Sequence, residues 1–197
     1  MTRIIAGTAG GRRLRTPRGS STRPTSDRVR EGAFSALVAA MGSLAGIGFL
    51  DLYAGSGAVG LEARSRGAAA VTLVEEDRRA AALIRSNAER VGLLPVTVLE
   101  AKVERVLAGH RTDGFDVVFA DPPYSLPAES LRDVVARLAS SGWSADAALV
   151  VLERSSRDPA WDWPPGFTAV RSKRYGETML WYGRAPGHRT LGGFPNG

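Results

Sequence analysis

Residues 47–60 read IGFLDLYAGSGAVG, and this stretch decides the fold class. The apolar run from Ile47 to Leu52 is typical of a buried β-strand. The glycines that follow allow a tight turn and let the backbone approach a ligand, and a helix is expected to begin near Ala58. The spacing Gly55-x-Gly57-x-x-Gly60 is a weak signal by itself, because it also fits a dinucleotide-binding turn. The stretch therefore predicts an α/β sheet with a ligand site at its carboxyl edge.

Apolar runs and helical patterns alternate from this stretch toward the C-terminus. Further strands are expected at 71–75, 96–99, 115–120 and 147–152, and helices at 77–91 and 129–139. Apolar spacing also predicts a helix from Asp27 to Met41. The segments 167–175 and 178–182 flank Gly176-Glu177 and predict a closing antiparallel hairpin. This alternation is typical of a mostly parallel sheet with helices on both faces.

Composition limits the possible classes of protein. With 197 residues, 44% of them hydrophobic, the chain is expected to build one core. It has no apolar run long enough for a membrane helix and no signal-peptide pattern, so we expect a cytoplasmic protein. We also expect a monomer. It contains no cysteine and two histidines, which excludes a cysteine nucleophile and a thiolate zinc site, and no metal is expected.

The excess positive charge lies at the N-terminus. Residues 1–30 hold eight arginines against one acid, whereas the remaining residues hold 18 basic side chains against 19 acidic ones. We therefore expect residues 1–25 to form a mobile basic arm for a polyanionic partner, although such arms also serve solubility alone. The catalytic domain is expected at 26–184, and residues 185–197 are expected to be a disordered tail.

The acidic residues near the glycine turn favour S-adenosylmethionine as the cofactor. Asp51 at the end of the first strand would repel a pyrophosphate, but it complements a cationic sulfonium and an ammonium group. A capping role in the turn is the alternative. Glu75 is expected at the ribose, and Glu100-Ala101 near the adenine or in a solvated loop. The residues expected to bind the cofactor are Asp51, Tyr53, Ala54, Gly55, Ser56, Gly57, Glu75, Glu76, Glu100 and Ala101.

The tetrapeptide Asp121-Pro122-Pro123-Tyr124 is the candidate catalytic site, since it directly follows the buried run 115–120. Ligands of parallel sheets bind beyond the carboxyl ends of the strands, so it should face the same crevice as the glycine turn, at adjacent strand ends if these two strands pair. An exocyclic purine amine is planar and nucleophilic only when its nitrogen pyramidalises. The Asp121 carboxylate and the Pro122 carbonyl can accept its two N–H groups, Pro123 stiffens the backbone, and Tyr124 can stack on the base. Positioning and electrostatics should carry most of the catalysis. A plain rigid turn is the alternative.

These motifs together resemble the class I amino methyltransferases, which have a Rossmann-like fold. More narrowly, residues 3–7 (RIIAG), 11–14 (GRRL) and 23–31 (RPTSDRVRE) are similar to the N-terminal signature of the bacterial 16S ribosomal RNA (guanine(966)-N(2))-methyltransferases. The resemblance covers about residues 3–184. This sequence departs from the family's pattern at Ala101-Lys102 and in the tail after Arg184.

This resemblance implies methylation of guanine N2 in 16S rRNA of the small ribosomal subunit or its assembly intermediate. It also implies a seven-stranded sheet whose last strand is antiparallel. Carried over by position, Arg23, Thr25 and Arg28 close over cofactor and RNA. The residues expected to contact RNA are Arg12, Arg13, Arg15, Arg18, Arg23 and Arg28.

Other functions remain open at this stage. A DNA adenine or protein glutamine methyltransferase could use the same two acceptors. A nucleotide-dependent dehydrogenase would need tight NAD binding, and it gives no reason for residues 121–124. A non-catalytic assembly factor could retain the fold.

Overall fold

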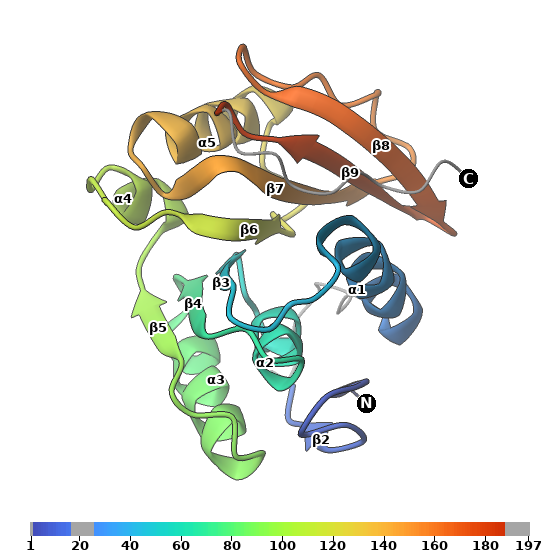
Figure 1. Cartoon of the computed structure of the whole chain (residues 1–197), viewed down its shortest axis with the longest axis vertical. Coiled ribbons are helices and arrows are strands. Elements are labelled where there is room, and N and C mark those ends of the chain that lie inside the picture. Colours follow the sequence, from blue (N-terminus) through green and yellow to red (C-terminus); the bar gives the residue numbers. More distant parts are fainter. Residues whose placement is uncertain (1, 17–25, 188–197) are drawn as a thin grey trace.

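A computed structural model describes residues 2–16 and 26–187 of the chain. Its main sheet has seven strands in the order β5-β4-β3-β6-β7-β9-β8 (Figure 1). The central strands β3, β4, β5, β6 and β7 are parallel, and β9 is antiparallel to both of its neighbours. The strands are β3 (Gly48–Leu52), β4 (Ala70–Glu75), β5 (Thr97–Glu100), β6 (Phe115–Ala120), β7 (Ser144–Ser155), β8 (Thr168–Tyr175) and β9 (Thr178–Arg184).

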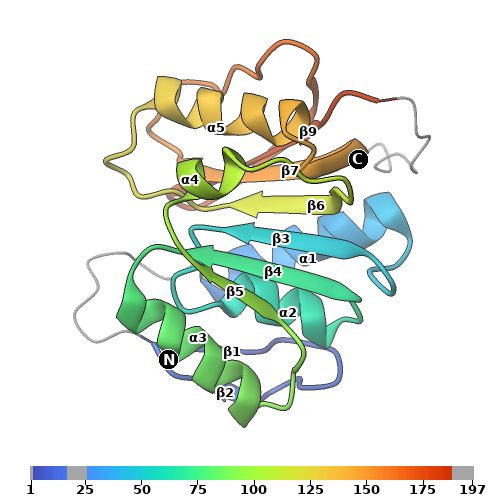
Figure 2. The same cartoon turned by 90° about the vertical axis from the view of Figure 1, so that its left-hand side faces the viewer.

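Helices cover both faces of this sheet (Figure 2). The helices α1 (Asp27–Met41), α2 (Ala58–Ser65) and α3 (Arg78–Arg90) pack on one face, where Phe34 and Ile84 share a core with Phe49. On the other face lie α4 (Val103–Leu107) and α5 (Ala128–Ser140), which bury Leu131 against Leu50. The expected α/β fold with helices on both faces is confirmed.

Most predicted elements agree with the structure to within a few residues. The helix at 27–41 and the strand at 115–120 have the predicted bounds. Two features of the main domain were missed. Helix α4 has five residues, which is too short for a helical period to be visible in the sequence. Strand β7 begins at Ser144 instead of 147, because the chain continues through an irregular pairing with β6 near Ala147, whose φ is +54°.

Residues 2–16 are not the mobile arm that the sequence predicted. Strands β1 (Thr2–Arg3) and β2 (Arg13–Leu14) pair with each other, and Ile4 and Leu14 are buried in a cluster with Leu61 of α2 and Val91. The prediction was wrong here because two isolated apolar residues give no period, yet they are enough to anchor a short hairpin. Residues 17–25 and 188–197 lie outside the described part.

A buried acid ties this hairpin to the domain. Glu62 of α2 is fully buried, and its carboxylate accepts the backbone N–H groups of Ile5 at 2.6 Å and Ala6 at 3.0 Å. Arg66 donates to the same carboxylate at 2.6 Å. The buried Arg30 of α1 lies 4.0 Å from Glu62 and donates to the carbonyl of Arg3. One ionic cluster therefore joins α1, α2 and the hairpin.

The ordered chain also continues past the predicted domain end at 184. Ala185 is buried, and its N–H donates to the carbonyl of Ala148 at 2.9 Å. The carbonyl of Pro186 accepts from Ala147 at 3.1 Å. The expectation of a disordered tail is therefore wrong for these first residues. Among the described helices, none has the length and apolar character needed to cross a bilayer.

Candidate active site

The candidate site lies where the parallel strands end. Strand β3 pairs with β4 on one side and with β6 on the other, so that Leu52 stands between Val74 and Ala120 (Figure 2). The next residues along the chain are therefore neighbours: the glycine turn after β3, Glu75 at the end of β4, and Asp121 after β6. The predicted adjacency of the glycine turn and the Asp-Pro-Pro-Tyr segment is thus present in the sheet.

The turn after β3 has the backbone that its glycines make possible. Gly57 has a φ of +77° and is the N-cap residue of α2, and its N–H donates to the carbonyl of Ala54 at 2.7 Å. Gly55 has a φ of +55°, and a Cβ at this position would meet no atom within 4 Å. The turn at Gly55 thus presents open space beside the backbone, as a ligand cradle requires.

Asp51 lies beneath this turn and not on its surface. Its side chain is buried, and its carboxylate accepts the N–H of Gly60 in α2 at 2.8 Å. The pKa of the Asp51 carboxyl is raised from 3.8 to about 8, because burial and, to a smaller extent, the charges of Asp121 and Glu75 raise it more than the hydrogen bond from Gly60 lowers it. The structure thus shows the capping contact that the sequence left as an alternative, and it places Asp121 and Glu75 within electrostatic reach of Asp51.

The raised pKa of Asp51 predicts a pH dependence of stability. The folded protein binds this proton more tightly than the unfolded chain, whose carboxyl has its ordinary pKa of 3.8. The free energy of unfolding should therefore fall as the pH rises from about 4 to about 8. Urea titrations across this range measure the slope, and Asp51→Asn should flatten it. If wild type and Asp51→Asn have equal slopes, Asp51 is not the group that titrates.

Glu75 fixes the glycine turn to the end of β4. Its carboxylate accepts the N–H of Gly55 at 2.8 Å and that of Asp77 at 2.8 Å. Asp77 in turn caps α3 by accepting the N–H of Ala80. Glu75 is half-buried and Glu76 is exposed. A ribose contact by Glu75 stays a prediction, because its oxygens here bind backbone N–H groups.

Glu100 and Ala101 lie at the end of β5, next to Glu75. The N–H of Ala101 donates to the carbonyl of Glu75 at 3.1 Å. The Glu100 side chain is exposed and pairs with Arg85 of α3 at 3.5 Å. This pair favours the solvated role of the Glu100 side chain. A contact of Glu100 or Ala101 with the adenine stays a prediction.

The segment 121–124 changes from half-buried to exposed along its length. Asp121 is half-buried and Pro122 is buried, whereas Pro123 is exposed and Tyr124 is 61% exposed. The N–H of Leu126 donates to the carbonyl of Pro123 at 2.9 Å and closes a turn. Asp121 thus lies at the rim beside the glycine turn, and the Tyr124 ring is accessible for stacking on a flat ligand.

The described arginines of the N-terminal hairpin are exposed, but two of them also help to hold the hairpin. Arg12 donates to the carbonyl of Val91 at 2.8 Å, and the N–H of Arg15 donates to Asn87 at 2.9 Å. Arg13 and Arg28 are exposed as well. The predicted Arg18, Arg23 and Thr25 lie outside the described residues.

Asn87 of α3 was not predicted. It is fully buried, and its side-chain N–H groups donate to the carbonyl of Arg15 at 2.9 Å and to that of Ser56 at 3.3 Å. It therefore links the hairpin to the glycine turn. The sequence did contain a signal that could have revealed Asn87: it is a polar amide on the apolar face of a helix, beside Ile84 and Ala88.

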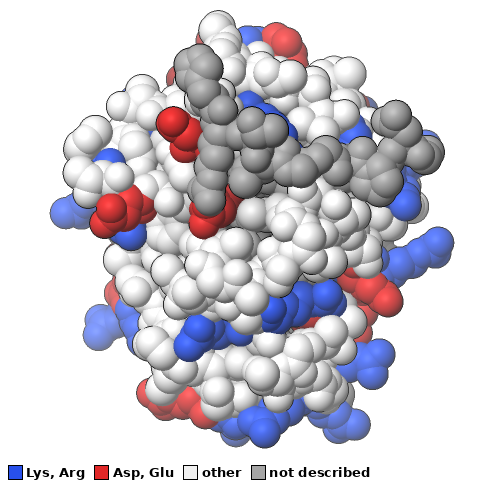
Figure 3. All heavy atoms as spheres, viewed as in Figure 1, with Lys and Arg blue, Asp and Glu red and all other residues white. Residues whose placement is uncertain are grey.

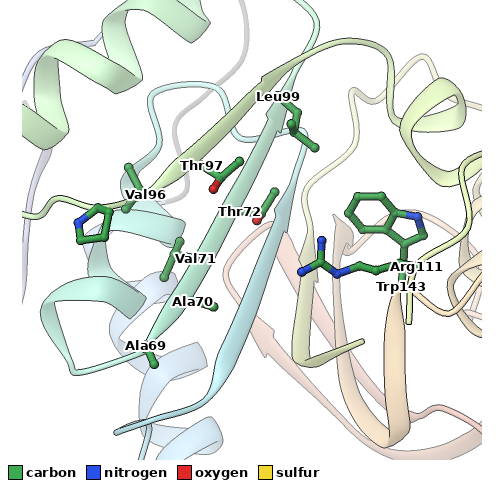
Figure 4. A pocket seen from close by; sticks show the side chains of 10 residues that line it. Ala69, Ala70, Val71, Thr72, Val96, Thr97, Leu99, Arg111 and Trp143 are labelled. Carbon is green, nitrogen blue, oxygen red and sulfur yellow. The ribbon is translucent and has the colours of Figure 1, made fainter. Parts of the chain in front are cut away.

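A separate hollow of about 330 Å³ lies along β4 and β5 (Figure 4). It is lined by residues near the amino ends of these strands, such as Thr72 and Thr97, and by Arg111 and Trp143. The Arg111 guanidinium lies 5.4 Å from the Trp143 ring centroid. This hollow is toward the opposite edge of the sheet from Asp51 and Asp121, so it is not part of the candidate site.

Comparison with known proteins places the chain in a family. The family model described as conserved hypothetical protein 95 matches residues 2–184. The chain is 35% identical over 175 residues to the ribosomal RNA small subunit methyltransferase D of Escherichia coli, covering 89% of this chain and 85% of that protein.

Solved structures of methyltransferases also resemble this chain. An Escherichia coli structure described as a candidate methyltransferase has a TM-score of 0.82 and 30% identity, with 95% of this chain and 99% of that chain covered. A Synechocystis magnesium protoporphyrin IX methyltransferase with bound S-adenosylmethionine is 17% identical with a TM-score of 0.63, over 80% of this chain and 78% of that chain, and shares the fold. The chain therefore belongs to the family described as conserved hypothetical protein 95, together with its ribosomal RNA small subunit methyltransferase D relatives.

Proposed function

We propose that this protein transfers a methyl group from S-adenosylmethionine to the exocyclic N2 of a guanine in 16S ribosomal RNA, at the guanine-966-type site. The substrate class follows the relatives, which include the ribosomal RNA small subunit methyltransferase D of Escherichia coli. The observation that carries the chemistry is Asp121, half-buried at the rim beside the glycine turn and in the field of Asp51. This function requires a protein of the bacterial cytoplasm that meets the small subunit or its assembly intermediate.

The charge and shape around the turn support the cofactor. Glu75 and Asp121 place two carboxyl groups at the ends of the strands on either side of the glycine turn, which favours a cationic ligand over a pyrophosphate. Gly55 leaves open space on the backbone where a ligand would approach. When bound, S-adenosylmethionine supplies a methyl group already activated by its sulfonium. The residues proposed to hold it are 53–57 of the turn, Glu75, and the backbone at 100–101.

The protein's own groups would then position the acceptor. The Asp121 carboxylate accepts one N–H of the guanine amino group, and the Pro122 carbonyl accepts the other, so that the nitrogen lone pair points toward the methyl group. Tyr124, which is 61% exposed, stacks on the base and fixes its plane. With the acceptor held in place, Asp121 acts mainly by orientation and charge.

Mapping of modified nucleosides in ribosomal RNA tests the substrate. In cells that lack this protein, one guanine of 16S rRNA should lose its N2-methyl group completely, and a plasmid copy of the wild-type gene should restore it. A plasmid copy carrying Asp121→Ala should not restore it. Full restoration by this variant would favour a non-catalytic assembly factor. Cells that lack the protein could instead keep all methyl groups of their rRNA and lose methylation of DNA or of a protein glutamine. That result would show that DNA or protein, and not rRNA, is the substrate.

A further inference from the structure

The outermost strand β8 carries positive charge at the edge of the sheet. Its sequence TAVRSKRY contains Arg171, Lys173 and Arg174 and no acid. Lys173 and Arg174 are exposed, and β8 is the last strand of the sheet on this side. Basic side chains project at the right-hand margin of Figure 3, where Figure 1 draws the end of β8. This charge lies outside the N-terminal region, where the sequence had placed the RNA contacts.

The strand register places this charge at the same edge as Asp121. Ala120 of β6 is paired with Leu152, Leu152 with Trp181, and Trp181 with Ser172 of β8. Strands β6 and β8 run in the same direction, because β9 is antiparallel to both β7 and β8. Asp121 directly follows Ala120, and Lys173 directly follows Ser172, so both residues lie one position beyond the same row of paired residues. Three strand spacings of 4.7–4.9 Å separate them by about 14 Å.

The described carboxylates do not neutralise these cations. Within residues 2–16 and 26–187, neither Lys173 nor Arg174 forms an ion pair, whereas Arg154 and Arg157 nearby do. The Lys173 ammonium lies 5.5 Å from the Tyr175 ring centroid. Arg174 donates its Nε–H to the carbonyl of Gly176 at 2.8 Å, which orients the guanidinium and uses one of its five donors.

Helix α1 brings a third cation to this edge. Gly32 is packed so closely on Tyr175 that a Cβ there would lie 2.3 Å from the tyrosine oxygen. Arg28 stands one helical turn before Gly32, on nearly the same side of the helix, and is exposed. Arg28 therefore lies near the end of β8, on the α1 face of the sheet.

We propose that Arg28, Lys173 and Arg174 form a phosphate-binding surface around the end of β8, here named the β8 surface, for the RNA strand that enters the active site. Lys173 shares the α1 face with Arg28, and Arg174, the next residue of the strand, leaves the opposite face at the same sheet edge. The inference rests on the proposed function. It assigns the two halves of the sheet different tasks: the β3-β4-β5 half holds the cofactor, and the β6-β7-β9-β8 half holds the RNA backbone that flanks the target base. Lys173, about 14 Å from Asp121, and the two cations near it would set the register of the strand without reading its sequence.

Salt dependence of RNA binding tests the β8 surface. The double variant Lys173→Gln/Arg174→Gln is compared with Arg105→Gln/Arg137→Gln, which removes the same charge from the exposed side of α4 and α5. Binding to small subunits from cells that lack the protein is measured over a range of KCl concentrations. Each lost phosphate contact should reduce the slope of log affinity against log salt by about 0.7–0.9. The β8 variant should therefore lose about 1.5 from its slope, and the control should lose little.

The outcomes separate this inference from the proposed function. S-adenosylmethionine binding should be unchanged in the β8 variant, and its KM for the subunit should rise much more than its kcat falls. If the wild type methylates the subunit and the β8 variant keeps the wild-type slope, the β8 surface is overturned and the function stands. In that case the edge lysine only discourages strand pairing between copies, as such lysines can. If the wild type methylates no RNA, the proposed function fails. A wild type that does not bind the subunit at all overturns both.

Discussion

Asp121→Ala is expected to lower the rate of methyl transfer by about 10²–10³-fold, the scale of losing one preorganised electrostatic contact in an active site. The variant removes the side-chain acceptor that orients the amino group, whereas the Pro122 carbonyl stays in place. The loss should appear in kcat and in kcat/KM to a similar extent, as expected for an interaction that strengthens in the transition state. Single-turnover transfer from labelled S-adenosylmethionine to small subunits measures the loss.

The control for this prediction is Asp133→Asn, which changes an exposed acid of α5 away from the site. It should keep the wild-type rate. S-adenosylmethionine affinity, measured by calorimetry, should change little in Asp121→Ala, because the turn at 53–57 and Glu75 are intact. An Asp121→Ala protein with wild-type turnover would show that residues 121–124 are only a rigid turn.

Glu62→Ala is expected to destabilise the protein by about 3–5 kcal/mol, the range for breaking a buried ion pair by removing one partner. The change removes one of the two acids beside the buried Arg30, which keeps its contact with Asp27 at 3.1 Å, and it removes the acceptor for the N–H groups of Ile5 and Ala6. The hairpin of residues 2–16 should then open, because its polar anchor on α2 is gone. Urea unfolding measures the free energy, and hydrogen exchange at Ile5 and Ala6 reports the hairpin.

The matched control is Glu89→Ala, an exposed acid on α3, which should change the free energy of unfolding by no more than about 0.5 kcal/mol. If Glu62→Ala is as mild as Glu89→Ala and the exchange at Ile5 stays slow, then the ionic cluster does not anchor the hairpin. Apolar packing of Ile4 and Leu14 would then hold it alone.

The central sheet could be predicted because its signals are local. A run such as 115–120 is apolar throughout, and helix 27–41 shows its period and its cap. The position of the site followed from a general rule about the carboxyl ends of parallel strands. Asp121 and the glycine turn were therefore placed at one edge before their pairing was known, and the pairing of β3 with β6 agrees.

The missed features depend on contacts between distant residues. Glu62 looks like an ordinary helix-surface acid, and only the fold brings Ile5 and Arg30 to it. Asp51 was expected to face a cation, but its carboxylate binds the N–H of Gly60, because the first turn of α2 passes directly above it. The charge on β8 was not connected with the active site, since three pairings of strands are needed to relate Lys173 to Asp121.

The most direct test of the central claim is to identify the product nucleoside. Small subunits from cells that lack the protein are incubated with the purified wild type and S-adenosylmethionine bearing a deuterated methyl group, and the 16S rRNA is digested and analysed by mass spectrometry. We predict that the label appears in N2-methylguanosine at a single position. Label on adenine, on a ring carbon or on ribose, with none in N2-methylguanosine, would contradict the proposed role of Asp121 and Pro122.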